Sequence, residues 1–388
     1  MNGVKDQVEF IFKVNGETLP PSTNLFNSVK IVEMGIGPIL PFLELSVRDQ
    51  RAANVQACQI AEGSIITVAA KRTDGDRLRE MEFRAIAPDF VNRQGDGHHN
   101  TNWFCMLNHP KYYSQVYHFC KRASSADMIG EIAAHCGLQY KSDPTSDSQI
   151  WRNFRRTNAG FAKKICAHGY INESSVMMLA ATAEDKTLHY RNIPVLFKQK
   201  PVAKFVLGNP GQVMPGGLPT YIVEQDRGTS GAGVTNAEYN YGFDMYSANF
   251  EGTDAYNKVK AQKCGSTHLS VNKTVKSEVS LARVQHFPFH DNNDNHKNYY
   301  KAPYQNARNL ALYSEFIAVL VPVQTVSNLL DLVEVEESYS QLDTRKTLRS
   351  GKYIVIGKGR MLAGSHYAEK LLLMRNTTTQ IDPKTLLI

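Results

Sequence analysis

The sequence predicts a mainly β protein in which two β domains flank a small α+β unit. Three observations predict this: short apolar runs between turn residues near the N-terminus, two stretches with helical spacing in the middle, and a pair of apolar runs near the C-terminus. A chain of 388 residues is too long for one compact core, so more than one domain is expected. The hydrophobic fraction of 42% and the charged fraction of 21% are typical of a globular protein.

The first β domain begins with apolar residues at alternate positions from Val8 to Val14, followed directly by Asn15-Gly16. Asn and Gly accept the positive φ angles of a tight turn, so this segment predicts a strand that leads into a hairpin. A polar loop is expected over Asn92–Thr101. Further strands at similar spacing favour a small antiparallel barrel or sandwich, and they are expected at Val29–Met34, Phe42–Val47, Ile65–Ala70, Met81–Ala87 and Asn102–Leu107.

Helical spacing and capping residues predict two helices after this β domain. Ser125-Ala126-Asp127 is an N-cap signal, and Gly137 ends the apolar pattern that follows it. A second helix is expected to begin at Asn158 and to end before Gly169. A hairpin with its turn at residues 183–186 completes the α+β unit, and its strands are expected at Val176–Ala181 and Leu188–Arg191.

The region between the α+β unit and the second β domain is rich in Gly and Pro. Residues from Pro194 to Gly233 are expected to form a connector with one strand, Thr220–Glu224. The segment Gly228–Gly233 does not fit a nucleotide-binding loop and is interpreted as a flexible turn. A strand is expected within Tyr239–Phe250, and an insertion at residues 256–307. A helix and two strands follow, and they are expected at Asn306–Tyr313, Phe316–Val321 and Leu329–Glu334.

The most strongly patterned segment is a hairpin near the C-terminus, formed by Tyr353–Ile356 and Tyr367–Met374. Both runs are apolar on both strand faces, so we expect both faces to be covered. A strand covered twice closes a barrel or lies between packed layers. A bend punctuated by glycine is expected between the runs, at Gly357, Gly359 and Gly364. Core residues are expected among Ile354, Ile356, Leu371 and Leu373.

The common sequence motifs of catalysis do not occur. Neither Gly-Lys pair is followed by Ser or Thr, as a P-loop requires, because the next residues are Tyr353 and Gly359. The patterns Gly-x-Ser-x-Gly and His-Glu-x-x-His are also missing. We therefore expect no catalytic residues, no bound cofactor and no enzymatic activity.

One cluster of residues has the donor types of a metal site, namely His98, His99, Cys105 and His109. Adjacent histidines on an extended chain point to opposite faces, so both cannot bind one tetrahedral ion without a bend. Cys105 and His109 would share a strand face but lie about 13 Å apart. We interpret the cluster as a solvated loop followed by a strand, and we expect no metal.

A group of cations is interleaved with aromatic residues and could bind single-stranded nucleic acid. A net charge of +7 is modest for this length, so we interpret the group instead as an interface or a solvated helix face. The cations are Arg152, Arg155, Arg156, Lys163 and Lys164, and the aromatic residues are Trp151 and Phe154.

Cysteine usage and hydropathy indicate a chain that folds in the cytoplasm. No apolar run approaches the ~18 residues that span a bilayer, and the longest candidate is Phe316–Val323. The N-terminal residues lack the pattern of a secretory signal. The six cysteines form no Cys-x-x-Cys pair and are interpreted as small buried residues: Cys58, Cys105, Cys120, Cys136, Cys166 and Cys264.

The order of these parts resembles the hub and spike-head proteins of contractile injection machines: phage baseplate hubs, late-control tail proteins and the heads of type VI secretion spikes. The resemblance lies in the helix at Ser125–Ile132, the run Trp151–Arg156, and the short helix that ends at Gly169-Tyr170. The closing β domain, from Phe316 to Arg375, resembles the same family.

The resemblance implies a structural role. Each chain would carry two tail-tube-like antiparallel β-barrels, and three chains would form a ring of six barrels between a six-fold tail tube and a three-fold spike. The expected division is a first barrel at 1–118, an α+β domain at 119–195, a connector and the start of the second barrel at 196–255, the insertion at 256–307, the remainder of the second barrel at 308–376 and a tail at 377–388.

The resemblance also implies partners and location. The partners would be two further copies of the chain, the tail tube or tube-initiator protein, the central spike protein, other baseplate proteins and, as a further candidate, the tape measure protein. DNA would pass through the lumen only in transit during genome ejection, without stable membrane association. The protein would be assembled in the host cytoplasm and located in the virion, at the baseplate of a tail that the nearest pattern indicates is contractile.

Two other functions stay open. The first is a tail-associated glycan hydrolase, for which Asp244, Glu251 and Asp254 are the candidate carboxylates. Nothing in their spacing sets the carboxyl separation that glycoside hydrolysis needs. The second is a binding module, meaning a receptor- or polysaccharide-binding tail protein.

Overall fold

The structure is a computed structural model that describes most of the chain. The residues described are 8–19, 26–50, 60–72, 80–92, 98–207, 218–230, 244–250, 259–266, 285–288, 295–296, 298–299, 302–321, 327–340, 343–346, 349–363 and 366–376.

The N-terminal part of the chain forms an antiparallel β unit with the strand order β2-β1-β5-β6-β7-β4-β3. Asn15 and Gly16 have φ angles of 51° and 94°, so the predicted hairpin turn is confirmed. The strands are β1 (Val8–Val14), β2 (Glu17–Thr18), β3 (Phe26–Met34), β4 (Phe42–Gln50), β5 (Ile65–Arg72), β6 (Met81–Asn92) and β7 (His98–Leu107).

The polar loop expected over Asn92–Thr101 is wrong at its two ends, and residues 93–97 lie outside the described residues. Strand β6 extends to Asn92 and β7 begins at His98, and the two strands pair out to Asn92 and His99. The ladder consists of backbone hydrogen bonds, which polar side chains do not prevent, so the polarity of this segment was a poor guide to its conformation.

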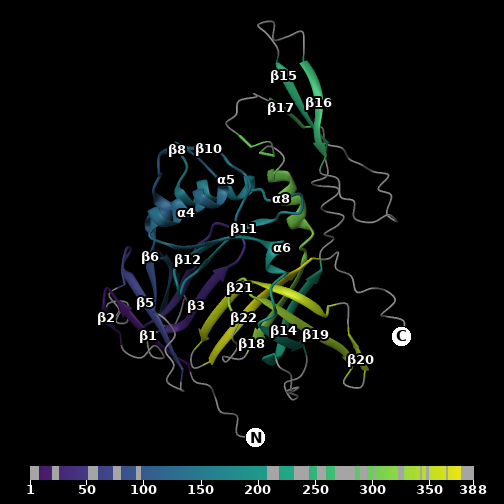
Figure 1. The fold of residues 1–388 in the computed structure, drawn as a ribbon. Helices are drawn as coiled ribbons and strands as arrows, with labels where there is room; N and C mark the ends of the chain where they lie inside the picture. The colour runs from purple at the N-terminus through teal and green to yellow at the C-terminus, as the bar shows by residue number, and fades with distance from the viewer. Residues whose placement is uncertain are drawn as a thin grey trace.

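A compact α+β unit follows, with one antiparallel strand pair, β10-β8, and a three-stranded sheet, β11-β12-β9 (Figure 1). Its elements are α3 (Pro110–Ser114), β8 (Phe119–Ala123), α4 (Ser125–Cys136), β9 (Gln139–Ser142), β10 (Gln149–Asn153), α5 (Asn158–His168), β11 (Met177–Thr182), β12 (Thr187–Asn192) and α6 (Ile193–Leu196). The predicted hairpin is therefore confirmed as β11 and β12.

The two predicted helices are confirmed as α4 and α5, with differences at their ends. The N-cap of α4 is Ser124, one residue before the predicted signal, and its side chain accepts a hydrogen bond from the backbone N–H of Asp127. Gly137 ends α4 in the left-handed conformation, with φ 76°. Gly169 instead has an extended conformation with φ −63°. A Cβ there would overlap the hydroxyl of Tyr190, so close packing explains this glycine.

The C-terminal part of the chain forms a closed six-stranded β-barrel. Its strand order is β21-β22-β18-β14-β13-β19, and pairing of β19 with β21 closes the ring, while β20 pairs with β19 at the edge. The strands are β13 (Ala203–Leu207), β14 (Thr220–Ser230), β18 (Glu315–Val321), β19 (Leu332–Ser340), β20 (Asp343–Lys346), β21 (Gly351–Ala363) and β22 (His366–Arg375).

Two sequence predictions in this part differ from the structure. The Gly/Pro-rich segment contains two barrel strands, β13 and β14, where only Thr220–Glu224 was expected, and Gly228 lies within β14 instead of a flexible turn. The strand expected at Leu329–Glu334 is present as β19, but it begins at Leu332, after Leu330 adopts a positive φ of 73°. Strands β13 and β14 pair with strands far away in the sequence, which the local pattern could not indicate.

The closing hairpin is confirmed, but its bend is not where it was expected. Strand β21 passes through Gly357 and Gly359, with a register shift between Val355 and Gly357. The third bend glycine, Gly364, lies outside the described residues. Both faces of Tyr353–Ile356 are covered as predicted, but Tyr367–Met374 is fully buried on one face only, since Lys370 is exposed and Leu372 is half-buried. The four expected core residues are at most 3% exposed: Ile354, Ile356, Leu371 and Leu373. Leu371 and Leu373 belong to the cluster inside the barrel, whereas Ile354 and Ile356 pack outside it, against the α+β unit.

A separate three-stranded sheet, with the order β16-β15-β17, projects from the molecule (Figure 1). Its strands are β15 (Asp244–Phe250), β16 (Val259–Ser266) and β17 (Gln285–Pro288). Helix α8 (Ala302–Ala311) brings the chain back to the α+β unit. There Asn306 Nδ2 donates hydrogen bonds to the carbonyl oxygens of Ala167 and Gly169, at 3.0 and 2.9 Å, which satisfies backbone groups at the end of α5.

Candidate functional site

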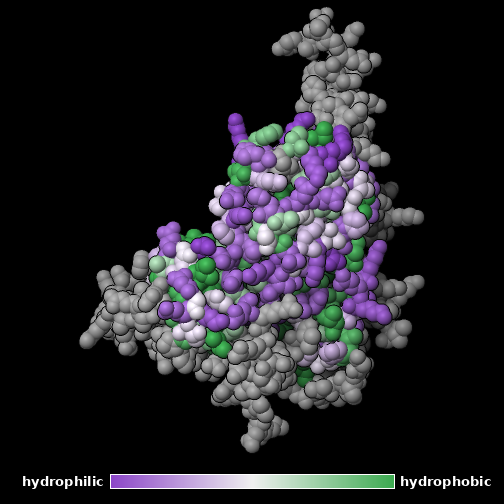
Figure 2. Space-filling model, turned by 60° about the vertical axis from the view of Figure 1, so that its left-hand side comes forward, coloured by the Kyte–Doolittle hydropathy of each residue, from purple (hydrophilic) through white to green (hydrophobic). Residues whose placement is uncertain are grey.

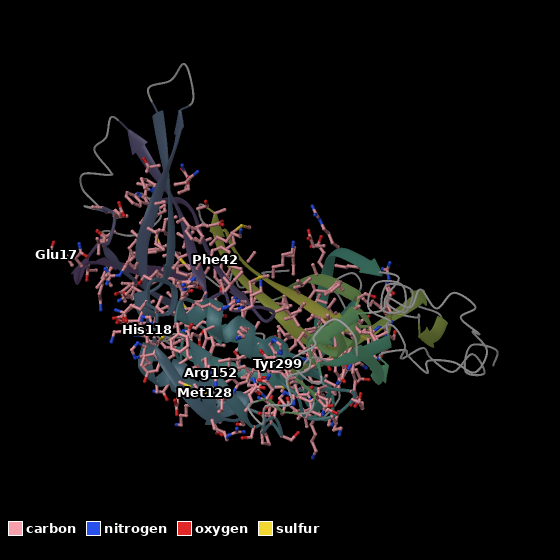
Figure 3. The ribbon with its side chains drawn as sticks, turned by 90° about the horizontal axis from the view of Figure 1, so that it is seen from above. Glu17, Phe42, His118, Met128, Arg152 and Tyr299 are labelled. Atoms are coloured by element: carbon pink, nitrogen blue, oxygen red, sulfur yellow. The ribbon has the colours of Figure 1, made fainter. Side chains whose placement is uncertain are left out.

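The two β units share one sheet. Strands β3 and β21 pair antiparallel from Met34↔Gly357 to Ser28↔Ala363, and this ladder joins the strands of both units into a 14-stranded sheet. Seen from above, the two β units lie on either side of this junction, with Phe42 near the place where they meet and Met128 and Arg152 on the α+β unit (Figure 3). The relative orientation of the units is therefore set by backbone hydrogen bonds.

One face of this shared sheet is continuous from the first unit into the barrel. Residues paired across antiparallel strands point to the same face, so the registers define rows that cross the sheet. One row crosses eight strands through Arg84, Met106, Phe42, Val32, Gly359, Lys370, Leu320 and Glu224. The next row contains Phe104, Glu44, Lys30, Met361 and Ala368. We call this surface the shared face.

The shared face mixes apolar side chains with paired charges. Phe104 is 39% exposed and Met361 is 45% exposed. Lys30 Nζ lies 3.0 Å from Glu44 Oε2, and Lys370 forms an ion pair with Asp226 of β14. In the view of Figure 2, hydrophobic side chains gather toward the first β unit, whereas the surface over the α+β unit is largely hydrophilic.

A hollow of about 400 Å³ lies on the shared face at the β3–β21 junction. Gly357 and Gly359 of β21 contribute no side chains there, which leaves space between the side chains of the two neighbouring strands, β3 and β22. The apolar lining consists of Val32, Met34, Phe316, Ala318 and Leu372.

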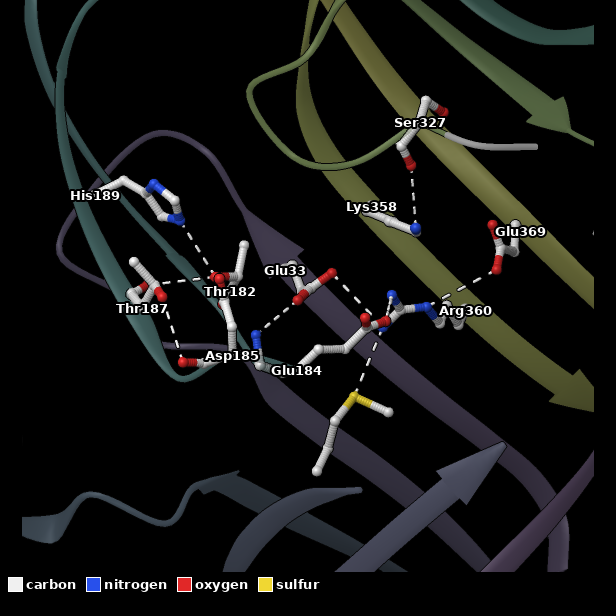
Figure 4. Close-up of polar contacts among 12 residues, drawn as sticks. Glu33, Thr182, Glu184, Asp185, Thr187, His189, Ser327, Lys358, Arg360 and Glu369 are labelled. Atoms are coloured by element: carbon white, nitrogen blue, oxygen red, sulfur yellow. Dashed lines mark hydrogen bonds and ion pairs between the residues drawn. The ribbon is translucent and has the colours of Figure 1, made fainter. Parts of the chain in front are cut away.

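A buried cluster of charges lies at the same junction, on the opposite side of the strands (Figure 4). The guanidinium of Arg360 is 3% exposed and lies between three carboxylates: Nη1 is 3.6 Å from Glu33 Oε2, Nε is 3.8 Å from Glu369 Oε1, and Nη2 donates to Glu184. Burial alone would lower the pKa of Arg360, but the carboxylates of Glu33, Glu184 and Glu369 outweigh it and the pKa is raised. The cluster thus joins the first unit, the α+β unit and the barrel.

Lys358 is a second buried cation near this cluster. Its Nζ atom donates a hydrogen bond to the carbonyl oxygen of Ser327 at 3.1 Å. Burial and the positive charge of Arg360 lower the pKa of Lys358.

A polar cavity of about 340 Å³ adjoins the charge cluster, and its lining includes Glu184, Asp185, His189, Arg191 and Arg360. Burial lowers the pKa of His189 to about 4, so this imidazole is neutral at neutral pH. Its Nε2 atom lies 3.2 Å from Thr182 Oγ1. Among the lining side chains, Glu184 pairs with Arg360, and Thr182 Oγ1 contacts both Asp185 and His189, so the cavity belongs to the junction.

No sequence motif predicts the charge cluster or the cavity. Glu33, Glu184 and Arg360 come from three distant segments, and only the fold brings them together. The available signal was the presence of two charged residues, Lys358 and Arg360, on one face of the otherwise apolar strand β21.

The structure describes the side chains of two residues of the candidate metal cluster, Cys105 and His109. Cys105 is fully buried in the core, and burial raises the pKa of its thiol to about 12. His109 precedes α3, and its Nδ1 atom donates to the carbonyl oxygen of Cys136 at 3.0 Å. His98 and His99 lie in β7, and their side chains are not described. Among the residues that the structure describes, no group of three or more His, Cys, Asp or Glu side chains is arranged to hold a metal.

The structure divides the basic aromatic group between core and surface. Trp151 is 1% exposed, its indole N–H donates to the carbonyl of Ala123 at 3.1 Å, and its ring packs edge-on against Phe161. Phe154 is 60% exposed, and the neighbouring Arg155 is exposed as well. Only one of the two aromatic rings is therefore available for stacking.

The remaining predicted residues give little information about a site. Asp244 begins β15, whereas Glu251 and Asp254 lie outside the described residues.

Cys136 is buried, but Cys120 is exposed, which corrects the expectation that all cysteines are buried. Within the described part of the chain, no helix is long and apolar enough to cross a membrane.

Comparison with solved structures identifies proteins with a similar fold. No model of a protein family matches the sequence, and no curated protein does. Two solved structures are similar over almost their whole length. The 43 kDa tail protein of prophage MuSo2 from Shewanella oneidensis has a TM-score of 0.56 at 10% identity, covering 97% of this chain and 99% of that one. A tail protein from Neisseria meningitidis MC58 has a TM-score of 0.53 at 11% identity, covering 95% and 97%. The chain therefore has the fold of phage tail proteins, as the resemblance predicted.

Proposed function

We propose that this protein is the structural hub of a phage tail baseplate. The single observation that carries the proposal is the β3–β21 ladder, which fuses two β units into one sheet with a continuous shared face. A chain built this way offers two β units in a fixed orientation. Its likeness in fold to two phage tail proteins supports the same conclusion.

Three copies of the chain would form a ring. Two β units in each of three chains give six units around one axis, which matches a six-fold tail tube on one side and a three-fold spike on the other. Closure of a ring also covers sheet edges, and exposed edges favour uncontrolled association.

The shared face would line the channel of this ring. Its ion pairs, Lys30–Glu44 and Lys370–Asp226, place opposite charges next to each other, so the face offers DNA no continuous cationic track. A surface of this kind suits DNA that passes through the lumen during ejection without being held.

The proposal includes the division of the chain and its partners. The first barrel would span 1–118, the α+β domain 119–195, the connector and start of the second barrel 196–255, the insertion 256–307, the rest of the second barrel 308–376, and the tail 377–388. The ring would contact the tail tube or its initiator, the central spike, other baseplate proteins and the tape measure protein. It would act in the virion of a contractile phage, without enzymatic activity.

Copy number in intact particles tests the hub function. Cryo-electron microscopy of tails is expected to find three copies of this chain around the axis, between tube and spike, and any other number contradicts the proposal. The purified chain is expected not to degrade peptidoglycan. Turnover of peptidoglycan that is lost on substitution of Asp244, Glu251 or Asp254 would favour the hydrolase instead.

A further inference from the structure

Among the residues that the structure describes, none packs closely enough on Gly359 to require a glycine there. Glycine in the middle of a strand weakens the strand, because it packs no side chain and gives the unfolded chain more freedom. Gly357 has an internal reason, since a Cβ there would lie 3.1 Å from Cβ of Leu372. At Gly359 a Cβ would meet nothing nearer than the carbonyl oxygen of Lys370, at 3.8 Å, which is an ordinary contact, and its φ is not positive. Within the described part of the chain, the space above Gly359 is therefore open to a binding partner.

The hollow around Gly359 has an apolar floor and a cationic rim. Lys30, Arg227 and Lys370 border it, and Lys30 and Lys370 lie on the same face as Gly359. Glu33 and Lys358 also line it, but their charged ends bond on the other side of the strands, to Ala183 N and Ser327 O. The hollow is thus apolar in the centre, and its edge carries three cations, of which Lys30 and Lys370 are each paired with an exposed carboxylate.

We propose that this hollow binds an extended segment of a partner protein, with an apolar side chain over Gly359 and a carboxylate next to it that pairs with Lys30 or Lys370. The two lysines are held by the exposed carboxylates of Glu44 and Asp226, and exposed pairs of this kind contribute little, so an incoming carboxylate can replace them. A flat glycine surface lets a second backbone approach closely.

The apolar floor argues against nucleic acid as the occupant. A phosphate backbone would satisfy the cations at the rim, but it has no aliphatic groups to fill the centre. The inference rests on the proposed hub function only for the position of the hollow in the channel of a ring; the binding itself needs one chain.

Filling the hollow tests the binding. Gly359→Leu places a side chain in the open space, and its Tm is expected to equal or exceed that of the wild type. Ala363→Leu is the matched control, because Ala363 is an exposed residue on the same face of β21 that does not line the hollow. The probes are three fluorescein-labelled dodecapeptides: alternating Leu and Glu, the same with Ser for Leu, and the same with Lys for Glu.

The Leu/Glu peptide is expected to bind the wild type and Ala363→Leu equally, and Gly359→Leu at least tenfold more weakly. The Ser/Glu and Leu/Lys peptides are expected to bind the wild type at least tenfold more weakly than the Leu/Glu peptide. The proposal is overturned if the Leu/Glu peptide does not bind, if Gly359→Leu leaves its affinity unchanged, or if the Ser/Glu peptide binds equally well.

Cross-linking in intact particles identifies the occupant. A photoreactive benzoylphenylalanine replaces Met361, which is 45% exposed and two residues from Gly359 on the same face. A cross-link to a protein segment with an apolar residue beside Asp or Glu is expected. A cross-link to DNA, to a second copy of this chain, or to nothing contradicts the proposal. The copy number of the same particles separates the two claims, since three copies without a bound segment would leave the hub function intact.

Discussion

Arg360 of the barrel places Nη1 3.6 Å from Oε2 of Glu33 on β3, so a buried ion pair joins the two β units beside their backbone ladder. The two side chains are 3% and 4% exposed. Glu33 Oε1 also accepts a hydrogen bond from the backbone N–H of Ala183 at 2.7 Å, in the α+β unit. One carboxylate therefore contacts all three parts of the molecule.

Replacing Arg360 by Met is expected to lower the free energy of unfolding by about 3–5 kcal/mol, because the buried carboxylates of Glu33 and Glu369 would lose the guanidinium with which they pair. Urea denaturation at neutral pH measures the change. Adding Glu33→Gln and Glu369→Gln to the variant is expected to restore part of the loss, since amides carry no charge.

The exposed pair Lys13–Glu80, 2.8 Å apart, provides the control for Arg360. Lys13→Met is expected to cost less than about 1 kcal/mol, as exposed ion pairs do. An Arg360→Met variant as stable as Lys13→Met would mean that water reaches the cluster and that it does not hold the units together.

Ile356→Ala is expected to lower the free energy of unfolding by about 2–5 kcal/mol, because this side chain is 3% exposed between the barrel and the α+β unit. Met361→Ala on the same strand is the control, since Met361 is 45% exposed. Thermal denaturation of the two variants measures the difference. If Ile356→Ala folds and melts like the wild type, the outer face of β21 is not packed as described.

The sequence predicted the elements whose pattern is local. Apolar residues on both faces of Tyr353–Ile356 indicated a strand covered twice, and the structure places Tyr353 and Val355 inside the barrel with Ile354 and Ile356 outside. The capping residues likewise located α4 and α5 to within one residue.

Elements that depend on distant partners were missed. Strand β13 is five residues long in a Gly/Pro-rich segment, and it is stabilised by parallel pairing with β14 and β19. No local period reports such pairing. The charge cluster at the junction was missed for the same reason, because Glu33 and Arg360 become neighbours only through the β3–β21 ladder.

Gly169→Ala is expected to lower the free energy of unfolding by about 1–3 kcal/mol, because its methyl group would overlap the hydroxyl of Tyr190. Tyr190→Phe removes that hydroxyl together with its hydrogen bond to Ser125 Oγ, at a cost of about 1 kcal/mol. The double variant is expected to be more stable than the sum of the two changes predicts, and a double-mutant cycle in urea measures the coupling. Additive losses would show that Tyr190 does not limit the space at Gly169.

Stability is expected to fall as the pH drops from about 6.5 to about 4. Burial lowers the pKa of both His189 and His168 to about 4, below the ordinary value of 6.5. The unfolded chain therefore takes up protons in this window while the folded chain does not, so each histidine lowers the free energy of unfolding by up to about 1.4 kcal/mol per pH unit. Urea denaturation from pH 4.5 to 7.5 measures the slope. His189→Gln is expected to reduce the slope by up to about 1.4 kcal/mol per pH unit, which corresponds to the uptake of one proton. His118→Gln, at an exposed position, is the control and is expected to leave the slope unchanged. An unchanged slope in His189→Gln would mean that the polar cavity admits enough water to keep this imidazole near its ordinary pKa.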